Sequence, residues 1–595
     1  MTGKTRILYI IIAAFLLSAS CVNLISAETN ELDYQNILNF QPLSAPPEPI
    51  RQVAEFEPME GVLINYGGEN NFGISYDIIA EMAEDVEVVT IVDSASQQSY
   101  VESLFLSHGV NLNNCRFLIA PSNSWWTRDY GPWFIFTGND ELGVTDFTYN
   151  RPRPYDDAIP SAFASNEGLP IYTMPLEHTG GNYMTDGQGI SISTDLVYTE
   201  NSGYTHEQIN GIVEDYLGIT TYHVVPDVNG EYIKHIDCWA KYLSPDTIMI
   251  REVTQSHSQY DEIEASVDYF EIQTSCYGTP YEIVRIYTPS DQPYTNSLVL
   301  NDKVLVPITG SQWDDEALAS YEAAMPGYEV LGFTGSWAST DALHCRAKGI
   351  PDRYMLYIEH TPLYGVQNGD AGVDIQAKIV PYSEESLISD STRVYWKEEN
   401  GSWDSVKMAP LGNDYYHAVI YPQEDGSTVY YYIHAEDNSG RSENHPYIGE
   451  EGAHSFIVNS TATNNPPEKP SKPSGETQGQ TGTSYPYSTS AIDPDGDKLE
   501  YGWDWDGDDT VDEWDNNNSN YYLSGTPIST SHAWPTDGTY NIKVKAKDIY
   551  GEESEWSDPL SITMPKNKGL YFILLDCLER FFPQIYLLFS NLPQF

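Results

Sequence analysis

The strongest constraint on the fold is an alternation of short apolar strands and amphipathic helices between about Gly61 and Gly335. The first cycle predicts strand 61–66, helix 75–83, strand 86–92, helix 97–107 and strand 116–120. Later cycles predict helix 207–217, strand 221–225, strand 299–307, helix 314–324 and strand 328–332. Repeated β-α-β units without a dinucleotide-binding fingerprint indicate an α/β domain. Periodicity alone does not separate a doubly wound sheet from a propeller.

The remainder of the chain predicts further domains, since 595 residues are too many for one core. After His360, short strands and turn sequences such as Glu399-Asn-Gly401 replace the helices. They predict an immunoglobulin-like β-sandwich over 361–460. Four prolines predict a stiff linker over 461–475. Residues 476–565 resemble a second β-sandwich of the polycystic-kidney-disease (PKD) type.

Both ends of the chain carry patterns that are typical of targeting or docking segments. Lys4 and Arg6 precede the apolar run 7–17, so 1–27 is predicted to be a signal peptide of a secreted or cell-surface protein. An uncleaved membrane anchor is the alternative. In the tail, 566–595, apolar residues recur at helical spacing until Pro583 interrupts them. An interfacial membrane helix, a partner-docking helix and a helix packed on its own neighbouring module all fit this pattern.

The formal net charge of −58 comes from 29 basic and 87 acidic residues. It argues against nucleic acid as a partner, because phosphate binding requires clustered lysine and arginine. It favours solubility and the attraction of cationic substrates. Adaptation of the surface to salty or calcium-rich surroundings explains the charge equally well. The six cysteines are scattered, so neither a disulfide framework nor a zinc ribbon is indicated.

Four dispersed side chains form a coherent set for attack on a planar cation such as a guanidinium. They are Asp129, His235, Asp237 and Cys345. Paired carboxylates can neutralise the cation, a thiolate can attack its carbon, and an imidazole can move protons. On a strand, His235 and Asp237 would face the same side, which would also suit a metal site completed by His178 or His344.

Five motifs carry a resemblance to a known family. They are Trp-x-Arg-Asp-x-Gly-Pro at 126–132, Gly-Gly-Asn at 180–182, His-x-Asp at 235–237, Asn296, and His344-Cys345. Over about 46–360 the chain resembles the agmatine deiminase and bacterial-type peptidylarginine deiminase family of the pentein superfamily, and it is most similar to the peptidylarginine branch. The resemblance implies a pentein fold, five ββαβ units around a pseudo-fivefold axis, followed by immunoglobulin-like modules.

The resemblance also implies roles for individual residues. Cys345 would be the nucleophile, His235 the proton carrier and Asn296 an orienting group, while Asp129 and Asp237 hold the guanidinium. Substrate contacts would come from Trp126 as a flat wall, from Arg151 and Arg153 as a carboxylate clamp, and from Tyr232 and Ile233. No cofactor is expected for catalysis.

The resemblance leaves three functions open. The first is an exported enzyme acting on arginine-containing peptides or proteins, chiefly at C-terminal arginine. The second is an agmatine deiminase or another enzyme of small guanidino compounds. The third is a non-catalytic surface-binding protein.

Acidic residues in the last module suggest a structural calcium site, with simple solvated turns as the alternative. They are Asp493, Asp495, Asp497, Asp504, Asp506 and Asp508.

Overall fold

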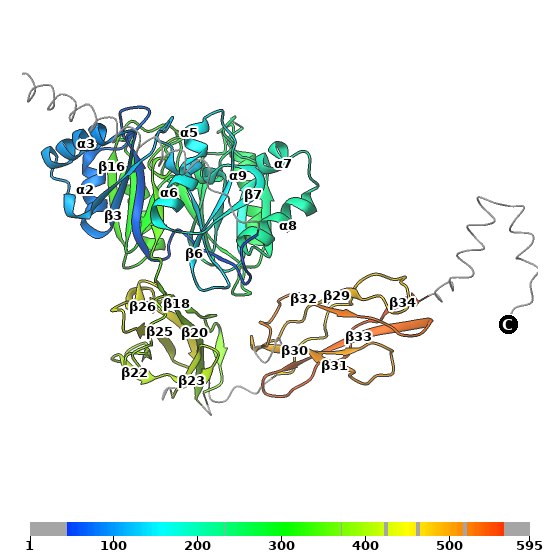
Figure 1. Ribbon diagram of the computed structural model, residues 1–595. Coiled ribbons are helices and arrows are strands. Elements are labelled where there is room, and N and C mark those ends of the chain that lie inside the picture. Colours follow the sequence, from blue (N-terminus) through cyan, green and yellow to red (C-terminus); the bar gives the residue numbers. More distant parts are fainter. Residues whose placement is uncertain are drawn as a thin grey trace, which may run out of the picture.

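A computed structural model describes residues 45–230, 232–369, 372–421, 426–459, 465–515 and 521–564. It contains an α/β unit followed by two β-sandwich units (Figure 1). The predicted signal peptide at 1–27 and the predicted tail helix at 566–595 lie outside the described residues. Within the described ranges, no helix is both long and apolar enough to cross a membrane.

The α/β unit consists of five small sheets with the same internal order. In each sheet a central strand pairs antiparallel with one neighbour and parallel with another, and at least one helix connects the parallel pair. The five triplets are β5 (Trp133–Phe136), β6 (Leu142–Tyr149) and β7 (Ile171–His178); β8 (Met184–Thr185), β9 (Ile190–Thr194) and β10 (Thr221–Val225); β11 (Ala240–Ser244), β12 (Thr247–Glu252) and β13 (Glu282–Tyr287); β14 (Leu298–Leu300), β15 (Lys303–Ile308) and β16 (Glu329–Thr334); and β17 (Lys348–Pro351), β2 (Met59–Asn65) and β3 (Glu87–Val92). This fivefold ββαβ order confirms the pentein fold.

Helices cover the outer faces of the sheets, and two short strands extend the sheets. The strands are β1 (Arg51–Gln52), which pairs with β5, and β4 (Cys115–Ile119), which pairs with β3. The helices are α2 (Tyr76–Asp85), α3 (Ala95–Ser107), α5 (Pro154–Asp157), α6 (Ile159–Glu167), α7 (Leu196–Glu200), α8 (His206–Leu217), α9 (Tyr260–Glu271) and α10 (Asp314–Ala324). A short 3-10 helix, η1 (Leu112–Asn114), follows α3.

The last strand of the α/β unit closes the ring against one of its first. β17 pairs antiparallel with β2, and Lys348 lies opposite Leu63. Cys345 precedes β17 by three residues, so ring closure brings this cysteine to the centre of the unit, beside segments nearly three hundred residues earlier in the chain.

Local sequence explains where some of the helices begin. Ser75 accepts a hydrogen bond from the Ile78 amide at the start of α2, as an N-cap residue should. Thr205 and Gln208 form a reciprocal capping box at the start of α8. One prediction was wrong: strand 299–307 is the hairpin β14–β15. Asn301 at its turn has φ of 54°, a left-handed conformation that asparagine tolerates, and the following strand reverses direction.

The second unit is a two-sheet β-sandwich of immunoglobulin type. One sheet contains β18 (Leu356–Glu359), β20 (Val373–Pro381), β24 (Tyr415–Ile420) and β23 (Ala409–Gly412). The other contains β19 (Val366–Gln367), β27 (His454–Val458), β25 (Thr428–Glu436), β21 (Arg393–Glu398), β22 (Asp404–Lys407) and β26 (Ser442–His445), with the 3-10 helix η5 (Gly449–Gly452) between β26 and β27. The expected boundary at residue 360 is too late, because β18 pairs with β20 and therefore belongs to this sandwich.

The third unit is also a two-sheet β-sandwich. Its sheets contain β28 (Ser474–Gly475), β29 (Tyr485–Thr489) and β32 (Ile528–His532), and β31 (Glu513–Asp515), β30 (Leu499–Asp504), β33 (Gly538–Asp548) and β34 (Leu560–Met564). Its core packs around Trp503 and Trp534, which are fully buried. The expected linker 461–475 extends too far, because the Glu468 and Ser471 amides bond to this module and β28 pairs with β29.

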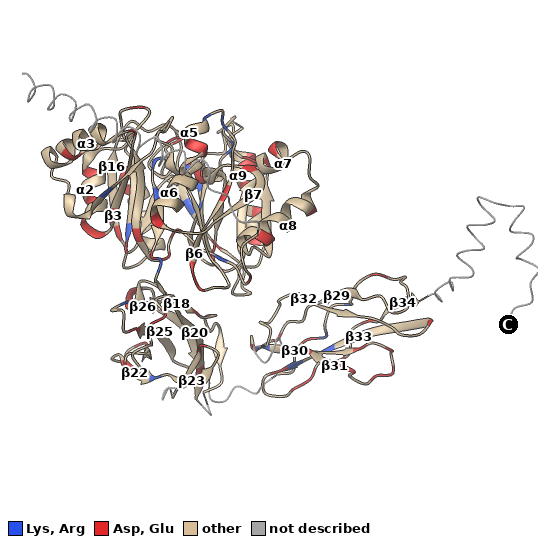
Figure 2. Cartoon of the chain, viewed as in Figure 1, with Lys and Arg blue, Asp and Glu red and all other residues tan. Residues whose placement is uncertain are grey.

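The first two units are joined by specific polar contacts. Arg441 of the second unit holds the Asp352 carboxylate with two nitrogen–oxygen distances of 2.6 Å. The Tyr277 hydroxyl lies 3.4 Å from His445 Nε2. Acidic residues are spread over all three units rather than gathered at one of them (Figure 2). The negative charge is therefore a property of the whole surface.

Candidate active site

Four single helical turns from different parts of the ring meet at its centre. They are α4 (Thr127–Tyr130), η2 (Gly180–Asn182), η3 (Ile236–Cys238) and η4 (His344–Arg346), and α4 packs against both η2 and η4 while η2 packs against η3. The prediction that His235 and Asp237 alternate on a strand was wrong. His235 is extended, but Ile236 begins a 3-10 turn, so strand alternation does not apply. The turn is fixed from outside, since Asn296 Nδ2 donates to the Asp237 carbonyl.

The thiol of Cys345 lies among polar groups and is almost fully buried, with 2 % of the residue exposed. Asn296 holds it from two sides: its Nδ2 lies 3.4 Å from the sulfur, and its Oδ1 accepts the Cys345 amide at 3.3 Å. The sulfur lies 3.8 Å from Asp237 Oδ2 and 4.0 Å from the Thr340 carbonyl. Two of the predicted site residues, Asn296 and Asp237, therefore contact the sulfur of a third.

His235 and Asp129 form a second pair at the same centre. His235 Nδ1 lies 3.5 Å from Asp129 Oδ1. Among the described residues, neither Asp129 Oδ1 nor His235 Nε2 has a hydrogen-bond partner, although both atoms are buried. Buried polar atoms are costly unless something satisfies them, so these two are suited to receive a substrate.

The Gly-Gly-Asn motif leaves room for the His235–Asp129 pair, because glycine has no side chain. A Cβ atom on Gly181 would overlap His235 Nδ1 and lie 2.7 Å from Asp129 Oδ1. Glycine is therefore the residue that allows η2 to approach the pair.

A network behind Asp237 was missed by the sequence reasoning. His344 Nδ1 lies 2.7 Å from Asp237 Oδ2, and His344 Nε2 lies 2.6 Å from Glu55 Oε2. Glu55 also pairs with Lys241 and Arg128, each at 2.6 Å. Glu55 is 289 residues from His344 in sequence, and no motif marks it. The network borders a cavity of about 70 Å³, whose lining includes Glu55, Asp237 and His344.

Burial and charge set the protonation of the site. Burial, together with the nearby Asp237 and Asp129, raises the pKa of Cys345 well above its usual value. Burial and Asp237 raise the pKa of Asp129 as well. Burial opposes ionisation of Asp237, but the hydrogen bond and charge of His344 lower its pKa overall. Burial lowers the pKa of His235 to about 4.

Because burial disfavours the protonated imidazole, His235 is not a positive partner for the Cys345 thiolate in the empty site. A bound cation is the remaining group that can lower the thiol pKa.

The predicted substrate-binding residues lie on the Asp129 side. Arg153 stacks on Trp126, with its guanidinium carbon 4.3 Å from the ring centroid. Arg151 lies 5.4 Å from the centroid of Tyr232, whose side chain is 78 % exposed beside Ile233. The positive charges of both arginines partly offset the rise in the Asp129 pKa that burial and Asp237 cause. The ring face of Trp126 thus already carries one guanidinium.

The histidines considered as further metal ligands are engaged elsewhere. His178 Nδ1 lies 3.1 Å from the Thr179 carbonyl oxygen, and its Nε2 lies 3.3 Å from the Tyr222 hydroxyl. Both ring nitrogens of His344 are held by carboxylates. These contacts favour a thiol-based site over a metal site. Over the ranges that the structure describes, candidate metal-binding groups occur in the third unit.

Comparison with known proteins gives the following matches. Residues 51–351 match the Porphyromonas-type peptidyl-arginine deiminase family, and residues 472–558 match the PKD domain family. An agmatine deiminase of Pseudomonas putida is 22 % identical over 301 residues, which is 43 % of this chain and 80 % of that protein.

Two solved structures are also similar. A putative arginine deiminase from Porphyromonas gingivalis is 19 % identical, covers 51 % of this chain and 98 % of its own, and gives a TM-score of 0.45. An agmatine deiminase of Enterococcus faecalis is 19 % identical, covers 53 % of this chain and 100 % of its own, and gives a TM-score of 0.48.

Proposed function

Since the chain belongs to the Porphyromonas-type peptidyl-arginine deiminase family, we propose that it is an exported enzyme that converts C-terminal arginine of peptides and proteins to citrulline. The chain is a deiminase, that is, a hydrolase of guanidino carbon–nitrogen bonds. The substrate, the covalent mechanism and the location outside the cell are the proposed parts.

The proposed reaction begins with neutralisation of the guanidinium by two carboxylates. Asp237 is held ionised by His344, and Asp129 becomes ionised when a cation enters. The same cation lowers the pKa of Cys345, so the thiol loses its proton only when substrate is present. This coupling suits an exported enzyme, because a neutral buried thiol resists oxidation.

Two displacements then complete the hydrolysis. Neutral His235 takes the proton of the Cys345 thiol as the sulfur bonds to the guanidinium carbon, and one carbon–nitrogen bond then breaks as His235 passes that proton to the departing ammonia. The remaining group is a thiouronium bound to the enzyme. His235 takes a proton from water, the oxygen bonds to the same carbon, and the carbon–sulfur bond breaks. Citrulline leaves and the thiol is restored.

The observation that carries the substrate choice is the arginine pair beside Asp129. Arg151 and Arg153 lie against the rings of Tyr232 and Trp126, and both act electrostatically on Asp129. Two guanidinium groups there would bind a carboxylate with charge-assisted hydrogen bonds. Agmatine carries no carboxylate, so a site for agmatine would gain only repulsion from them.

A substrate panel tests this proposal directly. Citrulline or ureido product would be measured from a peptide ending in arginine, the same peptide with its C-terminus amidated, free arginine and agmatine. We expect kcat/KM for the free C-terminus to exceed that for the amide by about 100-fold, the value of one or two charge-assisted contacts. Turnover of agmatine faster than the peptide would contradict the proposed substrate and favour an agmatine deiminase.

Three variants assign the roles. Arg151→Gln with Arg153→Gln should reduce activity on the free C-terminus by about 100-fold and leave agmatine turnover unchanged or higher. Arg393→Gln, in the second unit, is the control for loss of an arginine outside the site. Cys345→Ala should abolish product formation from every substrate. Full activity in this variant would exclude Cys345 as the nucleophile.

Recovery from the medium of a chain beginning at Glu28 would support export.

A further inference from the structure

The third unit holds two groups of aspartates, and they differ in how their charge is balanced. The first contains Asp493, Asp495 and Asp497, and the second contains Asp504, Asp506 and Asp512. In each group, one oxygen per residue lies within 4.8 Å of the others. Asp508, expected from the sequence to belong to the second group, instead bonds to Thr510.

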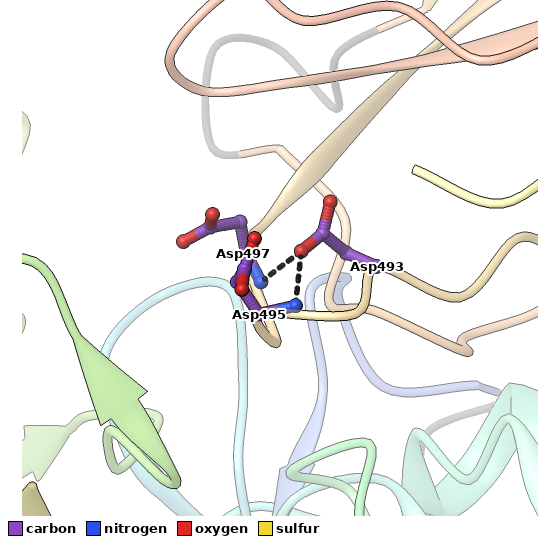
Figure 3. A group of neighbouring side chains, drawn as sticks. All are labelled: Asp493, Asp495 and Asp497. Carbon is purple, nitrogen blue, oxygen red and sulfur yellow. Dashed lines mark hydrogen bonds between the residues drawn. The ribbon is translucent and has the colours of Figure 1, made fainter. Parts of the chain in front are cut away.

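The first group is organised around a buried carboxylate. Asp493 is 3 % exposed, and its Oδ1 accepts the amides of Asp495 at 2.8 Å and Asp497 at 3.2 Å (Figure 3). Its Oδ2 is buried and has no hydrogen-bond partner among the described residues. A buried carboxylate oxygen without a partner is costly, and a cation is the ligand that would satisfy it.

A fourth carboxylate increases the negative charge at this place. Asp548, at the end of β33, is 1 % exposed and acts electrostatically on both Asp493 and Asp497. No lysine or arginine of the described residues forms an ion pair with Asp493, Asp495 or Asp497.

The second group already has its cation. Lys543 lies 3.4 Å from Asp504 Oδ2 and also pairs with Asp509. Asp506 and Asp512 are exposed. The two groups have the same composition, but only the second is balanced by a basic side chain.

We propose that the first group binds one calcium ion through Asp493, Asp495 and Asp497, with Asp548 as a nearby fourth carboxylate. Calcium takes several oxygen ligands in a flexible arrangement, which suits carboxylates from a loop and from a strand end. Zinc prefers nitrogen and sulfur ligands, none of which is contributed here. The ion would fasten the loop 493–497, which precedes β30, to the end of β33.

The bound ion would also organise the entry into the module. The Asn465 amide donates to Asp495 Oδ2 at 2.6 Å, and Asn465 Nδ2 donates to Asp495 Oδ1 at 3.1 Å. Asp495 therefore connects the proposed calcium site to the segment through which the chain arrives from the second unit. Calcium would stabilise both the module and its junction.

Calorimetry of the full chain tests the site. Isothermal titration should give one calcium per chain. The thermal transition of the third unit should rise by at least about 5 °C in millimolar calcium relative to EDTA, through preferential binding to the folded state. An equal concentration of magnesium should produce a much smaller rise, because magnesium demands a stricter geometry.

Two charge-matched double variants locate the ion. Asp495→Asn with Asp497→Asn should abolish the calcium-dependent rise, whereas Asp506→Asn with Asp512→Asn should retain it. In EDTA, the first variant should melt at or above the parent chain, because a repulsion has been removed. That result separates loss of the ion from failure to fold. Deiminase activity of both variants should equal that of the parent.

Several outcomes would overturn the proposal. They are the absence of a calcium-dependent rise in the parent chain, an equal rise with magnesium, a rise that survives in the Asp495→Asn, Asp497→Asn variant, and a rise lost only in the Asp506→Asn, Asp512→Asn variant.

Discussion

At the scale of single residues, the site keeps its two carboxylates in different states. His344 stabilises the ionised form of Asp237, while burial and Asp237 itself favour the protonated form of Asp129. The incoming guanidinium reverses the second preference. The pKa of the Cys345 thiol is also raised, first by burial and then by the two carboxylates. A substrate that neutralised these carboxylates would lower it.

This dependence predicts how Cys345 reacts with alkylating agents. Chloroacetamidine, which is cationic, should inactivate the enzyme at least about 10-fold faster than neutral chloroacetamide, after correction for their rates with glutathione. With the neutral reagent, the rate should rise about 10-fold per pH unit up to pH 9 without a plateau, because the raised pKa leaves the thiol protonated there. A plateau below pH 8 would contradict the raised pKa.

Gly181 predicts a separation of activity from stability. Gly181→Ala should lower kcat by about 100-fold, because the new Cβ displaces the His235 and Asp129 side chains. Gly203→Ala is the control, since its Cβ would meet nothing within 4 Å. Circular dichroism should show both variants folded. Unchanged kcat in Gly181→Ala would show that the pair can move without loss.

Glu55 predicts a stability effect with a defined pH dependence. Glu55→Gln should lower the free energy of unfolding by about 3–5 kcal/mol at pH 7, because Lys241 and Arg128 lose their buried partner. His344, Lys241 and Arg128 hold the pKa of Glu55 well below its usual value despite burial. A lowered carboxyl pKa stabilises above the unfolded value, so the difference should shrink as pH falls below about 4.5. Urea unfolding measures it, with exposed Glu48→Gln as the control.

The two kinds of site residue differ in how far sequence could reveal them. Cys345, His235, Asp237 and Asn296 stand in motifs, and the structure brings all four to one place. Glu55 stands in no motif and is defined only by its contacts across the closed ring. Its role could not have been predicted from spacing.

At the scale of elements, periodicity predicted α2, α3, α8 and α10, but it predicted neither the longer elements α9, β6 and β7 nor the active-site turns. Helix α10 begins and ends where predicted, at Asp314 and Ala324. The turns η3 and η4 are three residues each and show no period. They exist because neighbouring repeats hold them, as when the Asn296 carbonyl accepts the His344 amide. Tertiary contacts of that kind are invisible in local sequence.

Helix α8 offers a prediction with opposite signs at two glycines. Gly211→Ala should stabilise the protein by about 0.5–1 kcal/mol, because the position is inside the helix and open. Gly218→Ala should destabilise it by more than 1 kcal/mol, because φ is 70° and the Cβ would overlap the Ile50 carbonyl. Chemical denaturation of both variants measures the difference, and equal effects would contradict the assigned C-cap.

At the scale of the whole molecule, a buried histidine cluster lies at the junction of the first two units, and we expect it to make the folded state sensitive to acid. His445 Nδ1 lies 3.0 Å from His454 Nε2, and the His360 ring packs 5.4 Å from that of His445. His445 also lies beside Tyr277 of the first unit. Burial lowers the pKa of His445 to about 4 and those of His360 and His454 further.

The sign of the pH effect follows from those shifts. A histidine kept neutral in the folded state stabilises above its unfolded pKa of about 6.5, and this stability is lost as pH falls toward the folded value. For His445 the loss between pH 7 and 5 is about 2 kcal/mol. His445→Gln should flatten the pH dependence of unfolding by about that amount, whereas exposed His108→Gln should not. Parallel curves for His445→Gln and the parent would contradict it.

Closure of the ring by β17 against β2 has a consequence for synthesis. Cys345, the proposed nucleophile, sits at the end of the pentein sequence, and its neighbours in the candidate site come from the earlier repeats. Some 350 residues must therefore leave the ribosome before the complete site can form. A shorter nascent chain should have no deiminase activity. Activity should thus appear in one step as β17 docks, not grow with chain length.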